Sequence, residues 1–395
     1  MQITVVGQGY VGLPLAIAAS TAGNNVFGLD NNEIKIATLK SGKSFIEDLS
    51  DEVIKKHMES KRYTPTTDEA VINDSDVVLI CVPTPLNKVH KPDLTALMSA
   101  ITTVGKNLKV GALVIVESTI EPGTCRNKLL PSLIKESGLT ESEFNLAYSP
   151  ERIDPTNKTW QIHNTPKLVA GLTKAAAIKA KDFYAQFIDS ITLCASLEIA
   201  ETAKLLENSF RLINISFINE LAIYCQKIGI DISEVITAAA TKPYGFMPFY
   251  PSIGAGGHCI PVDPIYLANA AKAAGAPTRF IDLADEVNLS MPSYFVRRAE
   301  EKLSGLSGKK VLVIGISYKP NVADVRESPV EALIAGLNQK GAEVTWHDDL
   351  VKEWNGAKSV ALNSNYDLAI LATPHDYLDL TQLGDVPILS TRGSI

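Results

Sequence analysis

Short apolar runs alternate with longer segments of helical periodicity through the first half of the chain. The runs have the length of strands and are rich in Val, Ile and Leu, which is typical of parallel strands buried on both faces. Alternation of such strands with helical segments predicts a parallel sheet covered by helices. The expected strands are residues 3–6, 25–29, 77–82, 113–117, 145–148 and 167–170.

The pattern changes twice further along the chain. From about residue 198 a long helical pattern runs past Cys225 and ends at Gly229. Apolar runs return at 309–315, 343–348 and 366–374. They repeat the order of the first half: a strand into a glycine turn, a strand that ends in an acid, then an apolar strand into a Pro-containing turn. We expect domains at 1–195, 196–303 and 304–395, the first and last being doubly wound α/β domains.

Length and composition narrow the class of protein. A chain of 395 residues is long enough for two or three domains. No stretch approaches the ~18 apolar residues of a membrane span, and the chain opens on a strand without the pattern of a signal peptide, so we expect a cytoplasmic protein that binds no membrane. The net charge of −7 argues against a nucleic-acid partner. The five cysteines are scattered without a C-x-x-C pair, which argues against both disulfides and a zinc site.

A glycine fingerprint lies where the first strand meets the first helix. Gly7, Gly9 and Gly12 have the spacing that allows a tight turn, approach of the backbone to a pyrophosphate, and close helix packing. Asp30 ends the next strand, where it would accept hydrogen bonds from a ribose and repel a 2′-phosphate. The context predicts a Rossmann-like NAD site, the alternative being a glycine turn without a ligand. The third-domain copy lacks the later glycines after Gly315, so we expect no dinucleotide there.

A lone thiol lies in a loop stiffened by Gly and Pro at residues 256–264. Cys259 follows His258 and precedes Asp263, and the frame predicts a reachable nucleophile. The alternatives are a small buried side chain or, with His258, a metal ligand. A thiol and a dinucleotide site in one chain suggest oxidation through a covalent intermediate. The other cysteines are interpreted as core residues.

Two further groups of polar residues have both a functional and a structural interpretation. On the long helix, Glu201, Lys204 and Asn208 share one face, with Glu220 further along; such a stripe can carry chemistry or be the solvated side of an amphipathic helix.

Lys319 and Arg326 follow the first strand of the last domain. They lie where open sheets bind ligands and could hold an anion. The alternative is a solvated pair of cations offset by Asp324 and Glu327.

Several motifs together resemble the UDP-glucose/GDP-mannose dehydrogenase family over essentially the whole chain. The resemblance rests on residues 7–14 (GQGYVGLP), 82–85 (VPTP), 118–119 (ST), 149–152 (SPER), 204–208 (KLLEN), 256–259 (GGHC) and 326–328 (RES). It implies two Rossmann-like doubly wound α/β domains joined by a central helical domain with a long helix, a homodimer, and NAD as cofactor. The implied reaction is the four-electron oxidation of a nucleotide sugar at C6 through a thioester.

The resemblance also implies roles for matching residues. Cys259 would be the nucleophile, Lys204 would act on the C6 oxygen as base or cationic stabiliser, Asn208 would hold the oxyanion, and Thr119, Glu151 and Asp263 would position or activate water. The cofactor would contact Gly7, Gly9, Tyr10, Val11, Gly12, Asp30, Pro83, Thr84 and Thr119. The sugar nucleotide would contact Glu151, Arg152, Lys204, Asn208, Tyr250, Gly256, Gly257, Lys319, Arg326 and Arg392.

Residues 149–155 and 242–251 resemble the branch of the family that acts on UDP-N-acetylhexosamines. We expect UDP-N-acetylglucosamine as substrate, with UDP-N-acetylmannosamine or UDP-glucose as alternatives. The chain departs from the family at Ser252 and Ile253, where Gly and Pro are usual, and at the segment before Arg392. Two other classes remain: a regulatory protein that binds NAD and nucleotide sugars without turnover, and a two-electron β-hydroxyacid dehydrogenase, which needs neither Cys259 nor a third domain.

Overall fold

The computed structural model describes residues 1–46, 49–154, 157 and 159–393. The chain forms two compact units, Met1–Leu206 and Glu207–Ile395. Each unit has its own hydrophobic core, as expected for a chain of this length. Among the described residues, no helix is both long enough and apolar enough to cross a membrane.

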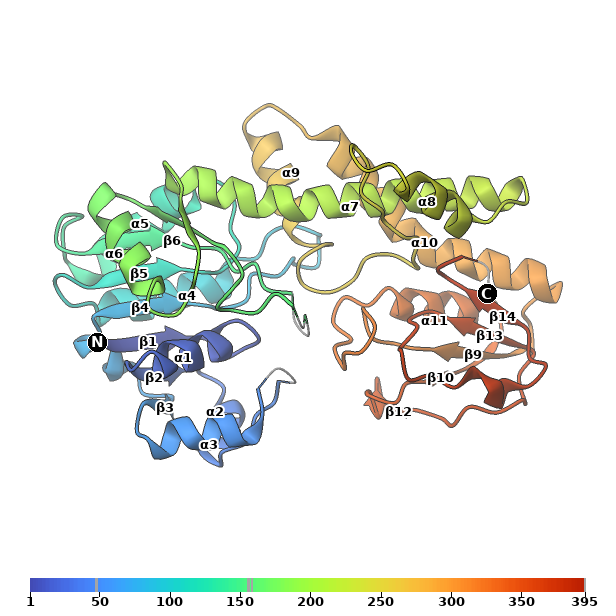
Figure 1. The fold of residues 1–395 in the computed structure, drawn as a ribbon, viewed down its shortest axis with the longest axis horizontal. Helices are drawn as coiled ribbons and strands as arrows, with labels where there is room; N and C mark the ends of the chain where they lie inside the picture. Colours follow the sequence, from blue (N-terminus) through green and yellow to red (C-terminus); the bar gives the residue numbers. More distant parts are fainter. Residues whose placement is uncertain (47–48, 155–156, 158, 394–395) are drawn as a thin grey trace. The chain divides into compact units, whose positions relative to one another are not determined.

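The first unit is built on one large sheet (Figure 1). Among the described residues it has eight strands in the order β3-β2-β1-β4-β5-β6-β7-β8. The strands are β1 (Gln2–Val6), β2 (Asn25–Leu29), β3 (Tyr63–Thr66), β4 (Val77–Ile80), β5 (Leu113–Val116), β6 (Asn145–Tyr148), β7 (Lys167–Gly171) and β8 (Ile191–Leu193). The order reverses between β1 and β4, which is the doubly wound arrangement.

Helices cover both faces of this sheet. The core on one face includes residues of α1 (Gly12–Thr21), α2 (Glu33–Lys40), α3 (Asp51–Glu59) and α6 (Lys174–Tyr184). The core on the other face includes residues of α4 (Thr95–Lys106), the π-helical turn η2 (Cys125–Leu129) and α5 (Leu130–Ser137), together with the 3₁₀ turn η1 (Glu69–Asp74). The predicted α/β sandwich is therefore confirmed for this part of the chain.

The sheet differs from the predicted one in two respects. β7 pairs with β6 in the antiparallel direction, whereas the alternation of strands and helices predicted a purely parallel sheet. The sheet also includes β3 and β8, which the apolar pattern did not identify. β3 contains Pro65, a residue that cannot donate to a ladder and is confined to edge positions such as this one. In β8, Thr192 and Leu193 are exposed, so no buried run marks the strand.

A long helix and three further helices follow the first sheet. They are α7 (Leu197–Lys227), α8 (Ile232–Ala240), α9 (Asp263–Ala273) and α10 (Arg279–Leu303). The expected end of the long helix is confirmed, because Gly229 adopts a φ of +74° two residues after the last helical residue. Left-handed backbone of this kind is the usual glycine termination of a helix. The fold thus contains the predicted helical segment between two α/β parts.

The second sheet is parallel throughout, with the order β10-β9-β13-β14. One face packs on α10 and α11, and the other on the turn η3 and nearby loops. These elements are β9 (Lys310–Ile314), α11 (Val330–Gln339), β10 (Glu343–His347), β13 (Leu368–Leu371), η3 (Leu380–Leu383) and β14 (Ile388–Ser390), beside a small ribbon of β11 (Glu353–Trp354) and β12 (Ala357–Lys358).

The two α/β parts share the same hydrogen bonds at the first turn. The Gln8 amide donates to Asp30 Oδ2 at 2.8 Å, and the Ile316 amide donates to Asp348 Oδ2 at 3.0 Å. Asp348 is also held by His375, whose Nε2 lies 3.1 Å from its Oδ2. The repeat predicted from the strand order is therefore present in atomic detail. In the second copy, however, the aspartate Asp348 is bound by a protein side chain, His375.

Candidate active site

The glycine turn between β1 and α1 has the shape that the fingerprint predicted. Gly7 has a φ of +93°, and a Cβ there would lie 2.7 Å from the Cys81 carbonyl oxygen. A Cβ on Gly12 would lie 1.8 Å from the Gly7 carbonyl oxygen. A Cβ on Gly9, in contrast, would have no neighbour within 4 Å. Gly7 and Gly12 are therefore needed by the fold, while Gly9 leaves open space where a pyrophosphate could approach the backbone.

Asp30 is fixed at the end of β2. Its Oδ2 accepts the Gln8 amide at 2.8 Å and its Oδ1 accepts the Asn32 amide at 2.9 Å. Lys35 Nζ lies 3.7 Å from Oδ2. A carboxylate has about four lone-pair positions, so two amide bonds leave capacity for the hydroxyls of a ribose. The turn and Asp30 together fit the adenosine half of NAD.

Other predicted residues of the first unit follow the carboxyl ends of parallel strands, which meet at one edge of a sheet. Pro83 and Thr84 follow β4, and Thr119 follows β5. The Ser118 hydroxyl donates to the Val82 carbonyl oxygen at 2.7 Å, which joins these two loops. Tyr10 and Val11 complete the glycine turn. The structure thus brings the predicted cofactor residues to one edge of the first sheet, as open α/β folds do with their ligands.

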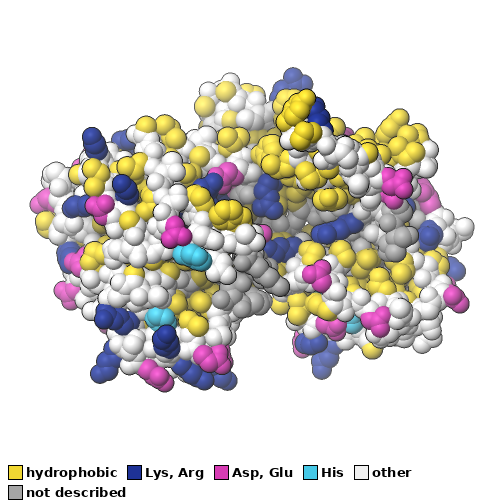
Figure 2. Space-filling model, viewed as in Figure 1, with side chains coloured by type: hydrophobic (Ala, Val, Ile, Leu, Met, Phe, Trp, Pro, Cys, Tyr) yellow, Lys and Arg dark blue, Asp and Glu magenta, His cyan; other side chains and the backbone are white. Residues whose placement is uncertain are grey.

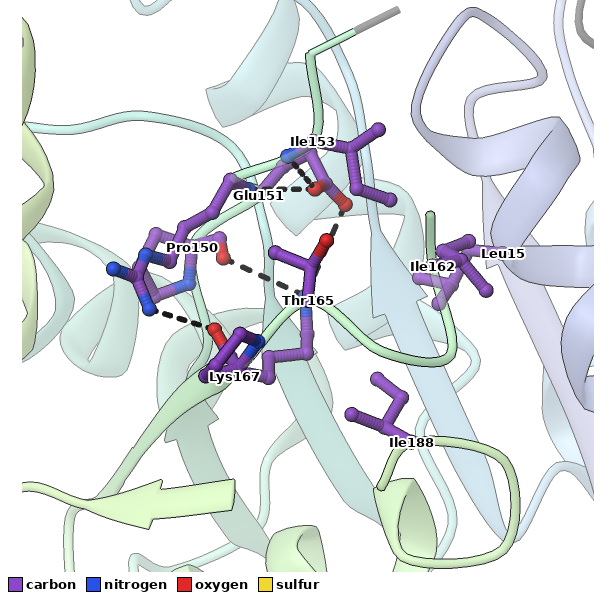
Figure 3. Close-up of a pocket in the computed structure, with 10 residues that line it drawn as sticks. Leu15, Pro150, Glu151, Ile153, Ile162, Thr165, Lys167 and Ile188 are labelled. Carbon is purple, nitrogen blue, oxygen red and sulfur yellow. Dashed lines mark hydrogen bonds and ion pairs between the residues drawn. The ribbon is translucent and has the colours of Figure 1, made fainter. Parts of the chain in front are cut away.

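Glu151 follows β6 at the same edge and belongs to a buried cluster that the sequence did not indicate (Figure 3). Its Oε1 accepts the backbone amides of Arg152 at 2.5 Å and Ile153 at 2.6 Å. Its Oε2 lies 3.9 Å from Lys167 Nζ. Lys167 in turn donates to Glu117 Oε2 at 2.7 Å. Arg152 is directed to a structural contact, since its Nη1 donates to the Pro166 carbonyl oxygen at 2.6 Å.

Burial controls the charge of the pair behind Glu151. Burial raises the pKa of Glu117 to about 7, although Lys167 offsets part of this effect. Burial lowers the pKa of Lys167, but Glu117 and Glu151 outweigh it and the net shift is upward. Lys167 is therefore a cation across the neutral range, while Glu117 exchanges its proton near neutral pH.

Glu117→Gln is expected to flatten the pH dependence of stability between pH 5 and 8. A carboxyl group whose folded pKa exceeds its unfolded pKa binds its proton more tightly when folded, so stability falls as pH rises from the unfolded pKa, near 4.5, to about 7. The fall is on the order of 1 kcal/mol per pH unit in that window. Urea titrations of both proteins at several pH values measure it. Parallel curves for the two proteins would contradict the assignment.

The residues of the polar stripe on α7 have different surroundings. Glu201 is buried and accepts the amides of Gly123 at 2.5 Å and Cys125 at 3.0 Å, so it caps the N-terminal end of η2. Burial raises its pKa, although these amides offset part of the effect. Lys204 is buried one turn before Asn208. Glu220 is exposed and does not join them.

Asn208 is oriented by the first residue of α9. Its Nδ2 donates to Asp263 Oδ2 at 2.6 Å, and both side chains are buried. This bond fixes the amide and leaves its second N–H and its oxygen for another ligand. The pair also links the long helix to the loop that carries the thiol.

Cys259 is exposed, whereas Cys81, Cys125 and Cys225 are buried and Cys194 is half-buried. Burial raises the pKa of Cys81 and of Cys125, which keeps those thiols protonated. The Cys259 carbonyl oxygen accepts the Asp263 amide at 2.9 Å, so the residue that carries the thiol lies in the turn before α9. The interpretation of Cys259 as a buried core residue is excluded.

The thiol loop packs tightly on the loop that follows β9. Gly257 has a φ of +84°, and a Cβ there would lie 2.8 Å from Tyr318 Cε2. A Cβ on Gly256 would lie 2.6 Å from the Glu327 carbonyl oxygen. Both glycines are therefore required by close contact. Among the described residues, no group of three or more His, Cys, Asp and Glu side chains is arranged to hold a metal ion.

The departure from the family pattern before this loop has a structural role. Ile253 is buried and packs in the core with Met291 and Phe295. The Ser252 amide donates to Asn219 Oδ1 at 2.8 Å. The loop is therefore held by packing and hydrogen bonds instead of by additional Gly and Pro residues. Tyr250 is exposed just before it.

The cations of the last domain differ from one another. Arg326 is bidentate on Asp324, with Nε–Oδ1 at 2.8 Å and Nη2–Oδ2 at 2.5 Å, so its charge is offset inside the same loop. Lys319 is half-buried in that loop, and Arg392 is exposed after β14. The structure thus brings Asn208, Asp263 and Cys259 together and joins the Cys259 loop to the Lys319 loop.

Three family models match the chain in succession. The NAD binding domain of the UDP-glucose/GDP-mannose dehydrogenase family matches residues 1–188. The central domain matches residues 198–290 and the UDP binding domain matches residues 312–389. A UDP-N-acetyl-D-glucosamine 6-dehydrogenase of Salmonella typhi is 34% identical over 95% of this chain and 90% of its own length.

Solved structures are similar over nearly the whole chain. The UDP-D-ManNAc dehydrogenase of Pyrococcus horikoshii has a TM-score of 0.92 and 32% identity, covering 99% of this chain and 95% of its own. A UDP-glucose dehydrogenase of Pyrobaculum islandicum has a TM-score of 0.90 and 26% identity, with 99% and 94% covered. With its N-terminal NAD-binding domain, the chain belongs to the UDP-glucose/GDP-mannose dehydrogenase family of NAD-dependent oxidoreductases.

Proposed function

We propose that this enzyme oxidises the C6 hydroxyl of UDP-N-acetylglucosamine to the uronic acid through a thioester on Cys259. The observation that carries the proposal is the exposed thiol before α9, beside the buried Asn208–Asp263 pair. A two-electron dehydrogenase needs no nucleophile, whereas an aldehyde must be converted to a tetrahedral adduct before a second hydride can leave. The net change is R–CH₂OH + H₂O + 2 NAD⁺ → R–COO⁻ + 2 NADH + 3 H⁺.

In the first stage, Lys204 removes the proton of the C6 hydroxyl or stabilises the resulting negative charge, as the hydride leaves carbon. Asn208 donates its remaining N–H to the same oxygen, because Asp263 holds the other one. Hydrogen bonds aimed at a developing oxyanion are worth several kcal/mol when they are preorganised. NAD⁺, which the glycine turn and Asp30 would hold, would supply the hydride acceptor, with a new NAD⁺ for each of the two oxidations.

In the second stage, the Cys259 thiolate adds to the aldehyde carbon. The C–S bond forms, the carbonyl π electrons move to oxygen, and that oxygen takes a proton. Loss of the hydride and the hydroxyl proton gives the thioester. Water, positioned by Thr119, Glu151 or Asp263, adds to this carbonyl, and the C–S bond breaks to release the acid and the thiolate.

Lys319, Arg326, Arg392 and Tyr250 would hold the nucleotide sugar in this proposal. In this proposal Lys319 and Arg326 contribute positive charge toward the diphosphate, and Asp324 orients the Arg326 guanidinium group. We also propose the three-domain division at 195 and 303, supported by the three family models.

The choice of sugar is tested by a panel of substrates. UDP-N-acetylglucosamine, UDP-N-acetylmannosamine, UDP-N-acetylgalactosamine, UDP-glucose and GDP-mannose are compared by the rate of NADH formation. We expect UDP-N-acetylglucosamine to have the highest kcat/KM, in line with residues 149–155 and with the name of the Salmonella typhi relative. The Pyrococcus horikoshii and Pyrobaculum islandicum proteins carry the names of other sugars, so a higher kcat/KM on either of those would replace the assignment.

Asp30→Ala is expected to raise the KM for NAD by about 10- to 100-fold, because hydrogen bonds to a charged group contribute roughly 1.5–3 kcal/mol. The variant should also discriminate less between NAD and NADP, since the charge that repels a 2′-phosphate is gone. Initial rates with both cofactors measure the two effects. Because Asp30 also holds the Gln8 amide, an unchanged melting temperature is the control. An unaltered KM would remove Asp30 from the cofactor site.

We further propose that the enzyme is a homodimer built on α7. Exposed apolar side chains repeat along one side of this helix at Leu206, Phe210, Phe217 and Tyr224, each 45–61% exposed. Their spacing of four and seven residues is that of a helix seam, and Figure 2 shows hydrophobic side chains on the surface over α7 and α8. Light scattering should give twice the mass of 42.6 kDa; a monomer at micromolar concentration would contradict the proposal.

We also propose that the enzyme works in the cytoplasm, because a reactive thiol is kept reduced in that compartment.

A further inference from the structure

Lys167, a buried cation close to Glu151, has no role in the mechanism above. Lys167 begins β7 with its side chain 7% exposed, and its ion-pair partner Glu117 is fully buried after β5. Glu151, with 15% of its side chain exposed, is the only carboxylate of these three charged groups that reaches solvent. The buried pair therefore lies behind a carboxylate that can meet substrate or water.

Each contact of this cluster limits the position of the next. The Tyr184 hydroxyl donates to Glu117 Oε1, and Lys167 Nζ binds Glu117 Oε2 at 2.7 Å. Lys167 Nζ also lies 5.0 Å from the centre of the Tyr184 ring and 3.5 Å from the Pro150 carbonyl oxygen. The ammonium group is thus held on several sides, with Glu151 Oε2 at 3.9 Å on another.

The two oxygens of Glu151 have different partners. Oε1 accepts two consecutive backbone amides, which fix the carboxylate plane, and Oε2 faces the Lys167 ammonium group (Figure 3). A general base must lie within reach of the proton that it accepts, in a fixed orientation. The contacts on both oxygens therefore hold Glu151 in one position, as a base requires.

A purely structural explanation of Lys167 is weaker. Replacement of a buried ion pair by apolar side chains of similar size is often neutral or stabilising. Apolar residues are abundant nearby, since Leu15, Ile162 and Ile188 line a small cavity together with Glu151 and Lys167. A fold that needed only packing here would not require two buried charges.

We propose that Lys167 is a positioning residue for the reaction: its buried ammonium group, anchored by Glu117, keeps the Glu151 carboxylate in place. Glu151 is the group that acts on water, and Lys167 acts only through it. Because this inference rests on the proposed function, its test must separate the two.

The titrating and charged groups that face this cluster come from several elements. Glu117 follows β5, Tyr184 ends α6, and Cys81 follows β4. Glu117 itself exchanges its proton near neutral pH, so it could produce a pH effect of its own. The comparison is therefore made in a Glu117→Gln background.

The experiment compares Glu117→Gln with Glu117→Gln/Lys167→Met, and wild type with Lys167→Met and Lys167→Arg. Lys167→Met alone leaves the Glu117 carboxylate buried without its cation, which can destabilise the fold. The double variant removes both buried charges and so avoids this effect. Lys109→Met removes an ion-paired lysine from the surface of the same sheet, where its Nζ lies 2.8 Å from Asp76, and is the matched control. Glu151→Gln reports on the proposed role of Glu151.

We expect Lys167→Met and the double variant to lose about 10- to 100-fold in kcat, with little change in KM for the UDP-sugar. A displaced general base forfeits only part of its contribution, which is roughly 10²- to 10⁴-fold. The rates of the double variant and of Glu117→Gln are compared at the same pH, so the titration of Glu117 does not enter the comparison. Lys167→Arg should restore most of the rate, and Lys109→Met should resemble wild type.

The outcomes separate the two proposals. Loss of activity in Glu151→Gln with wild-type kcat and pH profile in the Lys167 variants would overturn the role of Lys167 alone. A fall in kcat with a rise in KM and a lower melting temperature, not restored by Lys167→Arg, would show that Lys167 only supports the fold. Wild-type rates in Glu151→Gln would overturn the role of Lys167 and leave the proposed function standing, whereas no turnover of any UDP-sugar by the wild type would overturn both.

Discussion

Cys259→Ser is expected to lower turnover of the UDP-sugar by at least about 10³-fold while NAD still binds. A serine hydroxyl is hardly ionised near neutral pH and is a much weaker nucleophile than a thiolate. The adduct needed for the second hydride transfer then fails to form. Steady-state NADH formation measures turnover, and titration with NAD measures binding.

Cys194→Ser is the matched control, because Cys194 is half-buried in the first unit and apart from the thiol loop. It should keep the wild-type rate. A Cys259→Ser variant with more than about a tenth of wild-type turnover would remove the thioester from the mechanism. The resulting enzyme would then resemble a two-electron dehydrogenase.

Lys204→Met is expected to lower kcat by about 10²- to 10³-fold, with a smaller change in KM. Removal of one preorganised group that stabilises a developing oxyanion costs roughly this much, and methionine keeps most of the buried side-chain volume. The loss should fall on both oxidations, because the same oxygen carries negative charge in each. Pre-steady-state formation of the first NADH distinguishes this variant from Cys259→Ser, which retains the first oxidation.

Lys227→Met gives the matched control at the exposed end of the same helix. It should change neither kcat nor KM. If Lys204→Met retained wild-type kcat, the C6 oxygen would have to be activated by another group, and the buried position of Lys204 would have only a structural meaning.

The strands that the sequence predicted are those that apolar residues fill on both faces. β1, β4 and β5 are buried almost throughout, and a continuous apolar run identifies such strands. β8 is short and largely exposed, and the direction of β7 depends on its partner β6. Strand pairing is a tertiary property that local periodicity does not report.

The candidate residues were predictable where chemistry requires an unusual backbone or a lone functional group. Gly7 and Gly12 have neighbours that exclude a Cβ, and Cys259 lies in a loop whose glycines show the same effect. Lys167 could not be found in this way, because a lysine at the start of an apolar strand resembles an ordinary solvated end. Its significance depends on Glu117, fifty positions away in sequence, which only the fold brings near.

The measurement that tests the central claim most directly is the number of NADH formed per UDP-N-acetylglucosamine consumed, with the sugar limiting and NAD in excess. The account predicts two NADH and one equivalent of uronic acid per sugar, with no free aldehyde. One NADH per sugar with accumulation of the aldehyde would contradict it, since the thiol would then have no part in a second oxidation.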